Sequence, residues 1–121
     1  MNEQELVRVA AELAKPFSLG TEGSSASVAA ALLSSAGNVY CGVCIDLGCG
    51  LGFCAERSAA AEMLKHRETR VTRFVAVDSN GRIVRPCGVC REFLLQVDPR
   101  NGEAWVVLGS GTGCTLKELL P

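Results

Sequence analysis

The order of apolar segments constrains the fold of this chain more strongly than any other feature of its sequence. Two apolar runs, residues 28–33 and 39–45, flank the short glycine-containing segment SSAGN (34–38), an arrangement typical of a β-hairpin. After the hairpin, segments with helical and extended patterns alternate along the chain. That alternation predicts an α/β fold in which one antiparallel hairpin is joined to later strands through helices.

The limits of the other elements follow from apolar spacing and from proline and glycine. Residues 3–15 carry apolar side chains at helical spacing and Pro16 ends this helix, whereas the serine- and glycine-rich residues 16–26 predict a loop. Further helices are expected at 54–66, 86–97 and 115–120, and further strands at 73–78 and 104–108. Since no repeat, low-complexity tract or linker interrupts the pattern, we expect residues 1–121 to form a single domain.

The composition of the chain argues against several functional classes. With 121 residues, of which 48% are hydrophobic and 21% charged, the chain is typical of a compact globular domain. The net charge of −1, with acids and bases interspersed, leaves no basic stripe for long nucleic acid. No apolar run reaches membrane-spanning length, and the charged N-terminal segment lacks the apolar core of a signal peptide. The seven cysteines are an odd number, so we expect thiols or metal ligands in a reducing, cytoplasmic environment.

Two short motifs carry the residues best suited to chemistry. In PCGVC (86–90), Cys87 and Cys90 lie three apart at a helix start, where the sulfurs can point at one centre and free N–H groups favour thiolates. Cys54 begins the preceding helix, and three thiolates on Zn²⁺ would leave the fourth tetrahedral position to water, as in catalytic zinc sites. Glu56 follows Cys54 by two residues and is the candidate catalytic residue, placed to take a proton from that water and return it to a leaving group.

A ligand-x-Glu motif followed by Pro-Cys-x-x-Cys is the signature of zinc-dependent nucleobase deaminases, and both halves occur here in that order. We expect the other four cysteines to be small buried hydrophobes; they are Cys41, Cys44, Cys49 and Cys114. His66, the only histidine, lies near the end of a charged helical segment and is expected to be solvated there, not to bind metal.

The sequence resembles the small cytidine deaminases in GFCAERSAAAEML (52–64), in RPCGVCREFLL (85–95) and in KELLP (117–121). The run SVAAALLSSAGNVYCGV (27–43) is most similar to their blasticidin S deaminase relatives. The resemblance implies a three-layer αβα sandwich around a mixed five-stranded sheet, assembled as a homotetramer with active sites at subunit interfaces. It implies one Zn²⁺ per chain on Cys54, Cys87 and Cys90, with Glu56 as the proton shuttle. By the same resemblance, Arg57 would hydrogen-bond a ligand sulfur and offset the negative charge of three thiolates.

The sequence departs from that family where the sugar is held. Cytidine deaminases carry an Asn-x-Glu pair for the ribose hydroxyls, whereas the corresponding residues here are CID (44–46), and the small residues SAS (25–27) replace a phenylalanine. We therefore expect a cytosine nucleoside or analogue with an altered sugar, a small molecule, to be a better substrate than plain cytidine. The candidate substrate-binding residues are Asp46, Ala55 and Pro86.

One alternative interpretation is an S-adenosylmethionine-binding methyltransferase. The segment DLGCGLG (46–52) follows an apolar strand as a cofactor-binding loop would, and Asp78 ends the next strand as the expected acid. However, only one clear strand follows Asp78, and that fold needs a larger doubly wound sheet.

The other alternative is a non-catalytic zinc module that combines Cys41 and Cys44 with the later Cys-x-x-Cys pair. Residues three apart on an extended strand point to opposite faces, so Cys41 and Cys44 could not easily bind one metal together.

Overall fold

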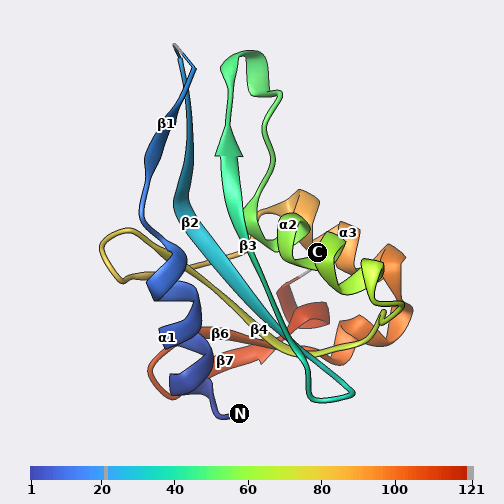
Figure 1. The fold of residues 1–121 in the computed structure, drawn as a ribbon. Helices are drawn as coiled ribbons and strands as arrows, with labels where there is room; N and C mark the ends of the chain where they lie inside the picture. The colour runs from blue at the N-terminus through green and yellow to red at the C-terminus, as the bar shows by residue number, and fades with distance from the viewer. Residues whose placement is uncertain (21, 120–121) are drawn as a thin grey trace.

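The structure is a computed structural model that describes residues 1–20 and 22–119 (Figure 1). Its three α-helices are α1 (Glu3–Leu13), α2 (Ala55–Lys65) and α3 (Gly88–Val97). The strands are β1 (Phe17–Leu19), β2 (Gly23–Ser34), β3 (Val39–Asp46), β4 (Val71–Asp78), β5 (Ile83–Val84), β6 (Trp105–Gly109) and β7 (Thr112–Thr115). Three 3₁₀ turns complete the described chain: η1 (Gly48–Gly50), η2 (Pro99–Glu103) and η3 (Leu116–Leu119). None of the described helices has the length and apolar character needed to cross a membrane.

The strands form one mixed sheet whose backbone order is β3-β2-β4-β6-β7. Among the strand pairs of the described residues, only β4 and β6 run parallel to each other. The short strand β1 pairs with the first residues of β2, and β5 pairs with the end of β4. Strand β2 therefore lies between its predicted hairpin partner β3 and the central strand β4.

The predicted number of strands is wrong, because the sheet of the described residues has seven strands and not five. Part of the loop expected at 16–26 forms β1 and the start of β2. Part of the helix expected at 115–120 is the 3₁₀ turn η3, and residue 120 lies outside the described range. The short strands β1 and β5 have three and two residues, too few for an alternating pattern to be recognisable. They are strands because a neighbouring strand supplies hydrogen bonds; segments this short do not specify a strand on their own, even where their residues, such as Ile83 and Val84, favour extension.

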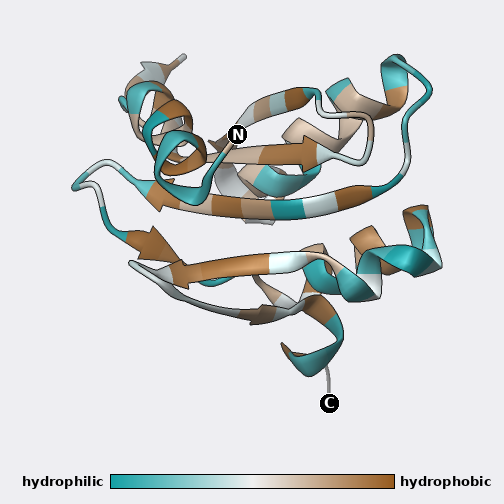
Figure 2. Cartoon of the chain, turned by 90° about the horizontal axis from the view of Figure 1, so that it is seen from below, coloured by the Kyte–Doolittle hydropathy of each residue, from teal (hydrophilic) through white to brown (hydrophobic). Residues whose placement is uncertain are grey.

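Helices cover both faces of the sheet, which confirms the three-layer αβα architecture (Figures 1 and 2). Successive side chains of a strand point to opposite faces, so the run AAALL (29–33) supplies apolar groups to both layers. Under α1, Ala31 packs in a cluster with Leu6 and Ala10, while Ala30 and Leu32 belong to the cluster under α2 and α3. Because both faces are buried here, residues 29–33 of β2 are continuously apolar and do not alternate with polar residues.

Helix α2 lies unusually close to β3, and this contact positions the start of the helix. A Cβ on Gly42 would be 2.3 Å from the backbone nitrogen of Ala59, so only glycine fits on the strand at this point. A Cβ on Gly52 would be 1.7 Å from the carbonyl oxygen of Ile45, beside the antiparallel bridge between Ile45 and Phe53. The chain is thus returned to the end of β3 immediately before α2 begins.

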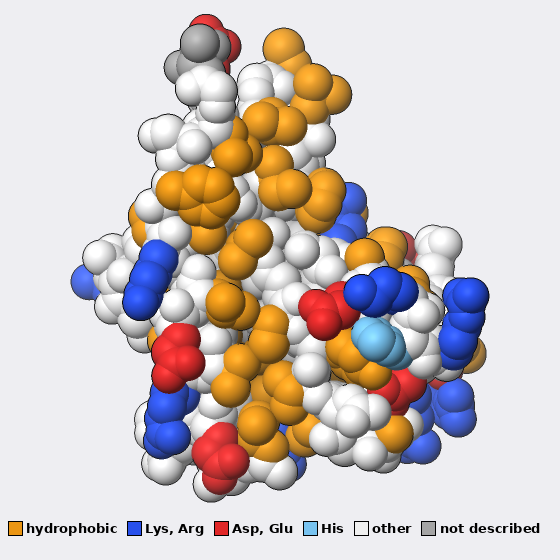
Figure 3. Space-filling model, viewed as in Figure 1, with side chains coloured by type: hydrophobic (Ala, Val, Ile, Leu, Met, Phe, Trp, Pro, Cys, Tyr) orange, Lys and Arg blue, Asp and Glu red, His pale blue; other side chains and the backbone are white. Residues whose placement is uncertain are grey.

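One end of the sheet projects beyond the helical layers (Figure 1). It consists of β1, the first half of β2, the end of β3 and the segment through η1. Hydrophobic side chains are visible along this projection in the space-filling view (Figure 3). The exposed large apolar residues of these segments are Phe17, Leu47, Leu51 and Phe53, and Leu51 is 77% exposed.

Candidate metal centre and active site

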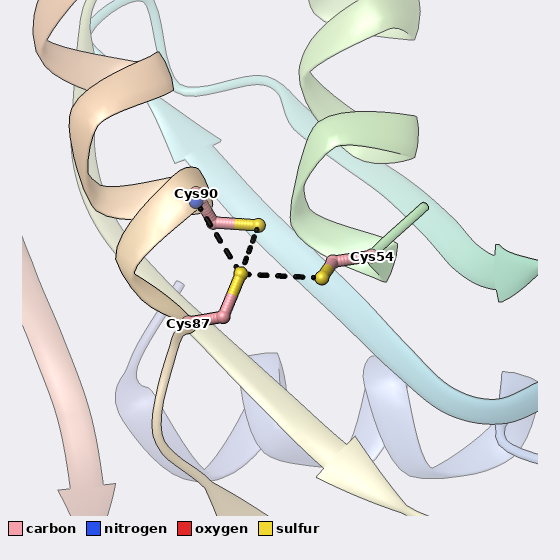
Figure 4. A group of neighbouring side chains, drawn as sticks. All are labelled: Cys54, Cys87 and Cys90. Atoms are coloured by element: carbon pink, nitrogen blue, oxygen red, sulfur yellow. Dashed lines mark hydrogen bonds between the residues drawn. The ribbon is translucent and has the colours of Figure 1, made fainter. Parts of the chain in front are cut away.

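Three cysteine sulfurs meet between the N-termini of α2 and α3 (Figure 4). Cys54 and Cys87 are the N-cap residues of the two helices, and Cys90 lies in the first turn of α3. The sulfurs of this thiol cluster all lie within 4.8 Å of one another, with 3.3 Å between Cys54 and Cys87 and 3.4 Å between Cys87 and Cys90. The structure thus brings together the three predicted ligands from segments more than 30 residues apart in the chain.

Protonation differs among the three thiols because their surroundings differ. Burial raises the pKa of Cys54 and, much more strongly, that of the fully buried Cys90. Burial also acts to raise the pKa of Cys87, but hydrogen bonds from the backbone N–H of Cys90 and from the Cys54 thiol outweigh it and lower the pKa. Three soft donors converge on one point beside two helix N-termini, and thiolates in this arrangement are the ligands that zinc prefers. The cluster therefore fits a single zinc ion.

Glu56 occupies the first turn of α2, two residues after a thiol of the cluster. Its side chain is buried, with only 4% of the residue exposed, and burial raises the pKa of its carboxyl group above the usual value. A carboxyl group with a raised pKa can hold and release a proton closer to neutral pH, as a general acid–base group must.

A cavity of about 390 Å³ opens onto the thiol cluster and Glu56. Its volume lies within the range of sites that bind small molecules. Of the candidate substrate-binding residues, Asp46 and Ala55 line the cavity. Pro86 is buried next to it, and its carbonyl accepts a hydrogen bond of 3.0 Å from Nε of Arg91. Its role in substrate binding stays a prediction.

Residues 1–104 match the family described as the cytidine and deoxycytidylate deaminase zinc-binding region. The chain belongs to this family. Since the matched region is zinc-binding and the thiol cluster fits one zinc ion, zinc is the cofactor of this site.

Among curated relatives, the chain is 33% identical over 97 residues to the cytidine deaminase of Halalkalibacterium halodurans, covering 78% of this chain and 74% of the relative. It is 37% identical over 68 residues to a probable cytidine deaminase of Dictyostelium discoideum, covering 54% of this chain and 46% of the relative.

Two solved structures have closely similar folds. The cytidine deaminase of Mycobacterium tuberculosis matches with a TM-score of 0.82 and 25% identity, covering 100% of this chain and 95% of that one. The cytidine deaminase of Mycobacterium leprae also has a TM-score of 0.82, with 24% identity and coverage of 100% and 98%. The structural matches cover all of this chain, including segments whose sequence periodicity did not predict a helix or a strand.

One wall of the cavity is more polar than the sequence suggested. The residues of this polar wall are Ser27, Cys44 and Asp46. The Ser27 hydroxyl donates to Oδ2 of Asp46 at 3.2 Å and lies 3.2 Å from the Cys44 sulfur, which is 3.5 Å from the same carboxylate oxygen. The i, i+2 spacing of Cys44 and Asp46 could have predicted their common face. Ser27 comes from another strand and was missed.

Ser27 faces the cavity because β2 is irregular at this point. Ala26 has a φ of 68°, in the left-handed region, and the pairing register with β3 shifts between Ser25 and Ala29. Such a bulge interrupts the regular alternation of side chains and redirects the residues beside it. Nothing in the local residues SAS (25–27) indicates this backbone conformation.

No hydrogen bond joins Arg57 to a ligand sulfur among the described residues. Its guanidinium carbon lies 5.8 Å from the centroid of the Phe53 ring, and its buried Nε has no hydrogen-bond partner among the described residues. Stacking on Phe53 holds the cation beside the cavity, which it also lines. A role for Arg57 next to the metal stays a prediction.

The remaining cysteines and the histidine lie outside the thiol cluster. Cys44 is buried as predicted, but Cys41 and Cys114 are only partly buried and Cys49 is exposed on the glycine-containing loop, so the prediction of a buried hydrophobe is wrong for Cys49. His66 is exposed at the C-cap of α2, where its ring stacks on Tyr40 at a centroid distance of 5.5 Å.

The geometry disfavours both alternative interpretations. Cys44 belongs to the cluster under α2, whereas Cys41 packs against the cluster under α1, so the two thiols do lie on opposite faces of the sheet. The glycine-containing loop follows β3, which pairs antiparallel with β2. A methyltransferase loop would follow a strand inside a parallel sheet.

Proposed function

We propose that this protein is a zinc-dependent hydrolase that removes the exocyclic amine of a cytosine nucleoside or nucleoside analogue as ammonia. The observation that carries the proposal is a buried carboxyl group, Glu56, in a cavity that is also lined by Cys54 and Cys87 of the thiol cluster. Family membership supports the same reaction class.

Cys54, Cys87 and Cys90 would hold one zinc ion per chain. When bound, zinc lowers the pKa of a coordinated water and so supplies the nucleophile for hydrolysis. Glu56 would accept a proton from the attacking water and give it to the ring nitrogen; it would then take a second proton, from the hydroxyl added to the ring, and give it to the departing amine. The raised pKa of Glu56 favours this role, because burial stabilises the protonated form that the second half of the reaction requires.

The polar wall is the proposed sugar site. Oδ2 of Asp46 is shared by Ser27 and Cys44, and in the described residues Oδ1 makes no hydrogen bond, so this oxygen is free to accept one sugar hydroxyl. A thiol is a weak hydrogen-bonding group, so Cys44 cannot replace the amide of an Asn-x-Glu pair. Plain cytidine should therefore turn over less efficiently than in a typical family member, and a nucleoside with an altered sugar should be preferred. The blasticidin S-type nucleosides are the second substrate class, on the similarity of residues 27–43.

A homotetramer in the cytoplasm is part of the proposal. The apolar projection carries exposed Phe17 and Leu51, and Phe53 on the cavity lining is 40% exposed, so further copies of the chain could bury these groups and close the cavity. The seven cysteines are all free in the described residues, in keeping with a reducing compartment. Light scattering at micromolar concentration is expected to give four chains per particle, and a monomer would contradict this.

The test of the function is a panel of aminopyrimidine and aminopurine nucleosides and bases, scored for ammonia release by the zinc-loaded protein. We expect release from cytosine nucleosides by the wild type and not by Glu56→Gln at equal zinc content. If the zinc-loaded wild type releases ammonia from no member of the panel, the proposed function is wrong.

A further inference from the structure

A cation at the cavity takes no part in the chemistry proposed above. Arg85 lines the cavity, and its side chain is exposed there. It follows β5 directly and precedes the Pro-Cys-x-x-Cys segment that holds two of the thiols. Its position therefore relates it to the substrate and not to the core of the fold.

The backbone on both sides of Arg85 is held in place. Before it, Ile83 and Val84 pair with Val77 and Ala76 of β4. After it, the carbonyl of Pro86 accepts the 3.0 Å hydrogen bond from Nε of Arg91, whose Nη1 also donates to the carbonyl of Leu119 at 2.6 Å. A side chain mounted on a fixed backbone loses less freedom when it binds a ligand, which favours specific recognition.

The charged residues that line the cavity are Asp46, Glu56, Arg57 and Arg85. Of these, Arg85 is the cation available to a ligand. Arg57 is partly buried and stacked on Phe53, and Glu56 is buried, whereas Arg85 is exposed. Arg85 forms no salt bridge with an acid of the described residues, whose two ion pairs involve Arg100 and Lys117.

Asp46 and Arg85 belong to opposite walls of the cavity. Asp46 ends β3 and Arg85 follows β5, and the strands β2 and β4 lie between them. No salt bridge joins the two charges in the described residues, so each wall can select a different part of one substrate.

We infer that Arg85 binds an anionic group, a phosphate or a carboxylate, carried by the sugar of the substrate; this assignment rests on the proposed function. The guanidinium fork offers parallel N–H donors to two oxygens of such an anion. The preferred substrate is then an anionic cytosine nucleoside derivative, with its base at the thiol cluster and its anion at the cavity rim. The phosphate form is a nucleoside monophosphate and the carboxylate form a nucleoside uronate.

The experiment compares kcat/KM for cytidine, cytidine 5′-monophosphate and cytidine 5′-carboxylate in zinc-loaded protein. The wild type is expected to prefer one of the two anions to neutral cytidine, and the larger ratio identifies the source of the anion. Arg85→Gln should lower the ratio of anionic to neutral kcat/KM about tenfold, as expected for one charge-assisted interaction at a partly exposed site, and Arg85→Lys should restore part of it. Arg82→Gln removes a charge three residues away, outside the cavity lining, and should leave the ratio unchanged.

Binding of the products uridine and uridine 5′-monophosphate, measured by calorimetry, gives a readout apart from turnover. Equal ratios in the wild type, Arg85→Gln and Arg82→Gln would overturn the inference and leave the proposed function intact. If no nucleoside released ammonia but uridine 5′-monophosphate bound more tightly than uridine only when Arg85 was present, the proposed function would fail and the anion site would stand. High salt should reduce the wild-type preference, because the site is exposed to solvent.

Discussion

The thiol cluster and the polar wall lie in one cavity but are built in different ways. The cluster consists of three cysteines at two helix N-termini, among them the fully buried Cys90. The buried Glu56 lies beside it. The polar wall consists of strand residues brought together by pairing across a bulge, and Asp46 in it is exposed. A site built from local motifs tolerates little change, whereas one built from an exposed strand surface can vary in specificity while the chemistry is kept. We therefore expect changes to the cluster to abolish function and changes to the wall to alter the choice of substrate.

The largest effect is expected from removing a thiol. Cys87→Ala should reduce zinc from one per chain to a small fraction, with loss of deaminase activity, because a site with two thiols and no replacement ligand binds zinc weakly. Metal analysis of the dialysed protein measures this. Cys49→Ser is the matched control, since Cys49 is exposed outside the cluster, and it should keep its zinc. Full zinc content in Cys87→Ala would contradict the assigned ligands.

Glu56→Gln should come next, with kcat reduced by about a hundredfold to ten-thousandfold, the usual contribution of a positioned acid–base group. Zinc content and uridine affinity should stay near wild type, because the amide has nearly the same shape. Steady-state kinetics and metal analysis separate these effects. Glu62→Gln lies exposed on the same helix and serves as the control. A kcat within threefold of wild type would exclude Glu56 as the proton shuttle.

A smaller effect is expected at the polar wall. Asp46→Ala should lower kcat/KM for cytidine about tenfold, mainly through KM, because it removes one charge-assisted hydrogen bond to the sugar. Ser27→Ala should act in the same direction but less strongly, since Ser27 only orients the carboxylate. Cytidine turnover at the typical efficiency of the family, unchanged by Asp46→Ala, would refute the altered sugar site while leaving the deaminase proposal intact.

The smallest effect is expected at the far end of α2, where Glu68 ties the helix to the hairpin and not to the substrate. Its carboxylate accepts hydrogen bonds from Ser34 at 2.6 Å, from Asn38 at 2.8 Å and from the Tyr40 hydroxyl. The Ser34 bond, with those from Tyr40 and Asn38, lowers the pKa of Glu68. Glu68→Gln should lower Tm by a few degrees at neutral pH without changing zinc content.

The pH dependence of that effect follows from the sign of the shift. A carboxyl group with a lowered folded-state pKa stabilises the fold above its unfolded pKa of about 4.3, and this contribution is lost as the pH falls. The Tm difference between wild type and Glu68→Gln should therefore shrink in acid, whereas the exposed control Glu12→Gln should show none. An equal difference at pH 3 and pH 7 would mean that the charge of Glu68 contributes nothing.

The fold class and the three thiols of the cluster could be predicted from the amino-acid sequence alone. Helix starts are local features, so Cys54, Glu56 and the Pro-Cys-x-x-Cys segment could be assigned to N-termini from neighbouring residues alone. The alternation of strand and helix indicated an α/β fold, and the resemblance to cytidine deaminases implied its three αβα layers. Asp46 became a candidate through the resemblance, because it stands where the family has the acid of its Asn-x-Glu pair.

The number of strands in the sheet and the set of residues that line the cavity depend on tertiary contacts. Strands β1 and β5 exist through pairing with β2 and β4, and their own residues carry too short a pattern to specify extension. Ser27 reaches the cavity through a bulge at Ala26, and Arg85 through the exit of β5. Pairing register and backbone irregularity depend on contacts between distant segments, whereas helix capping depends on residues three or four apart. The half of the cavity with the proposed catalytic residues could therefore be predicted from the sequence, whereas the half proposed to select the substrate forms only when the sheet assembles.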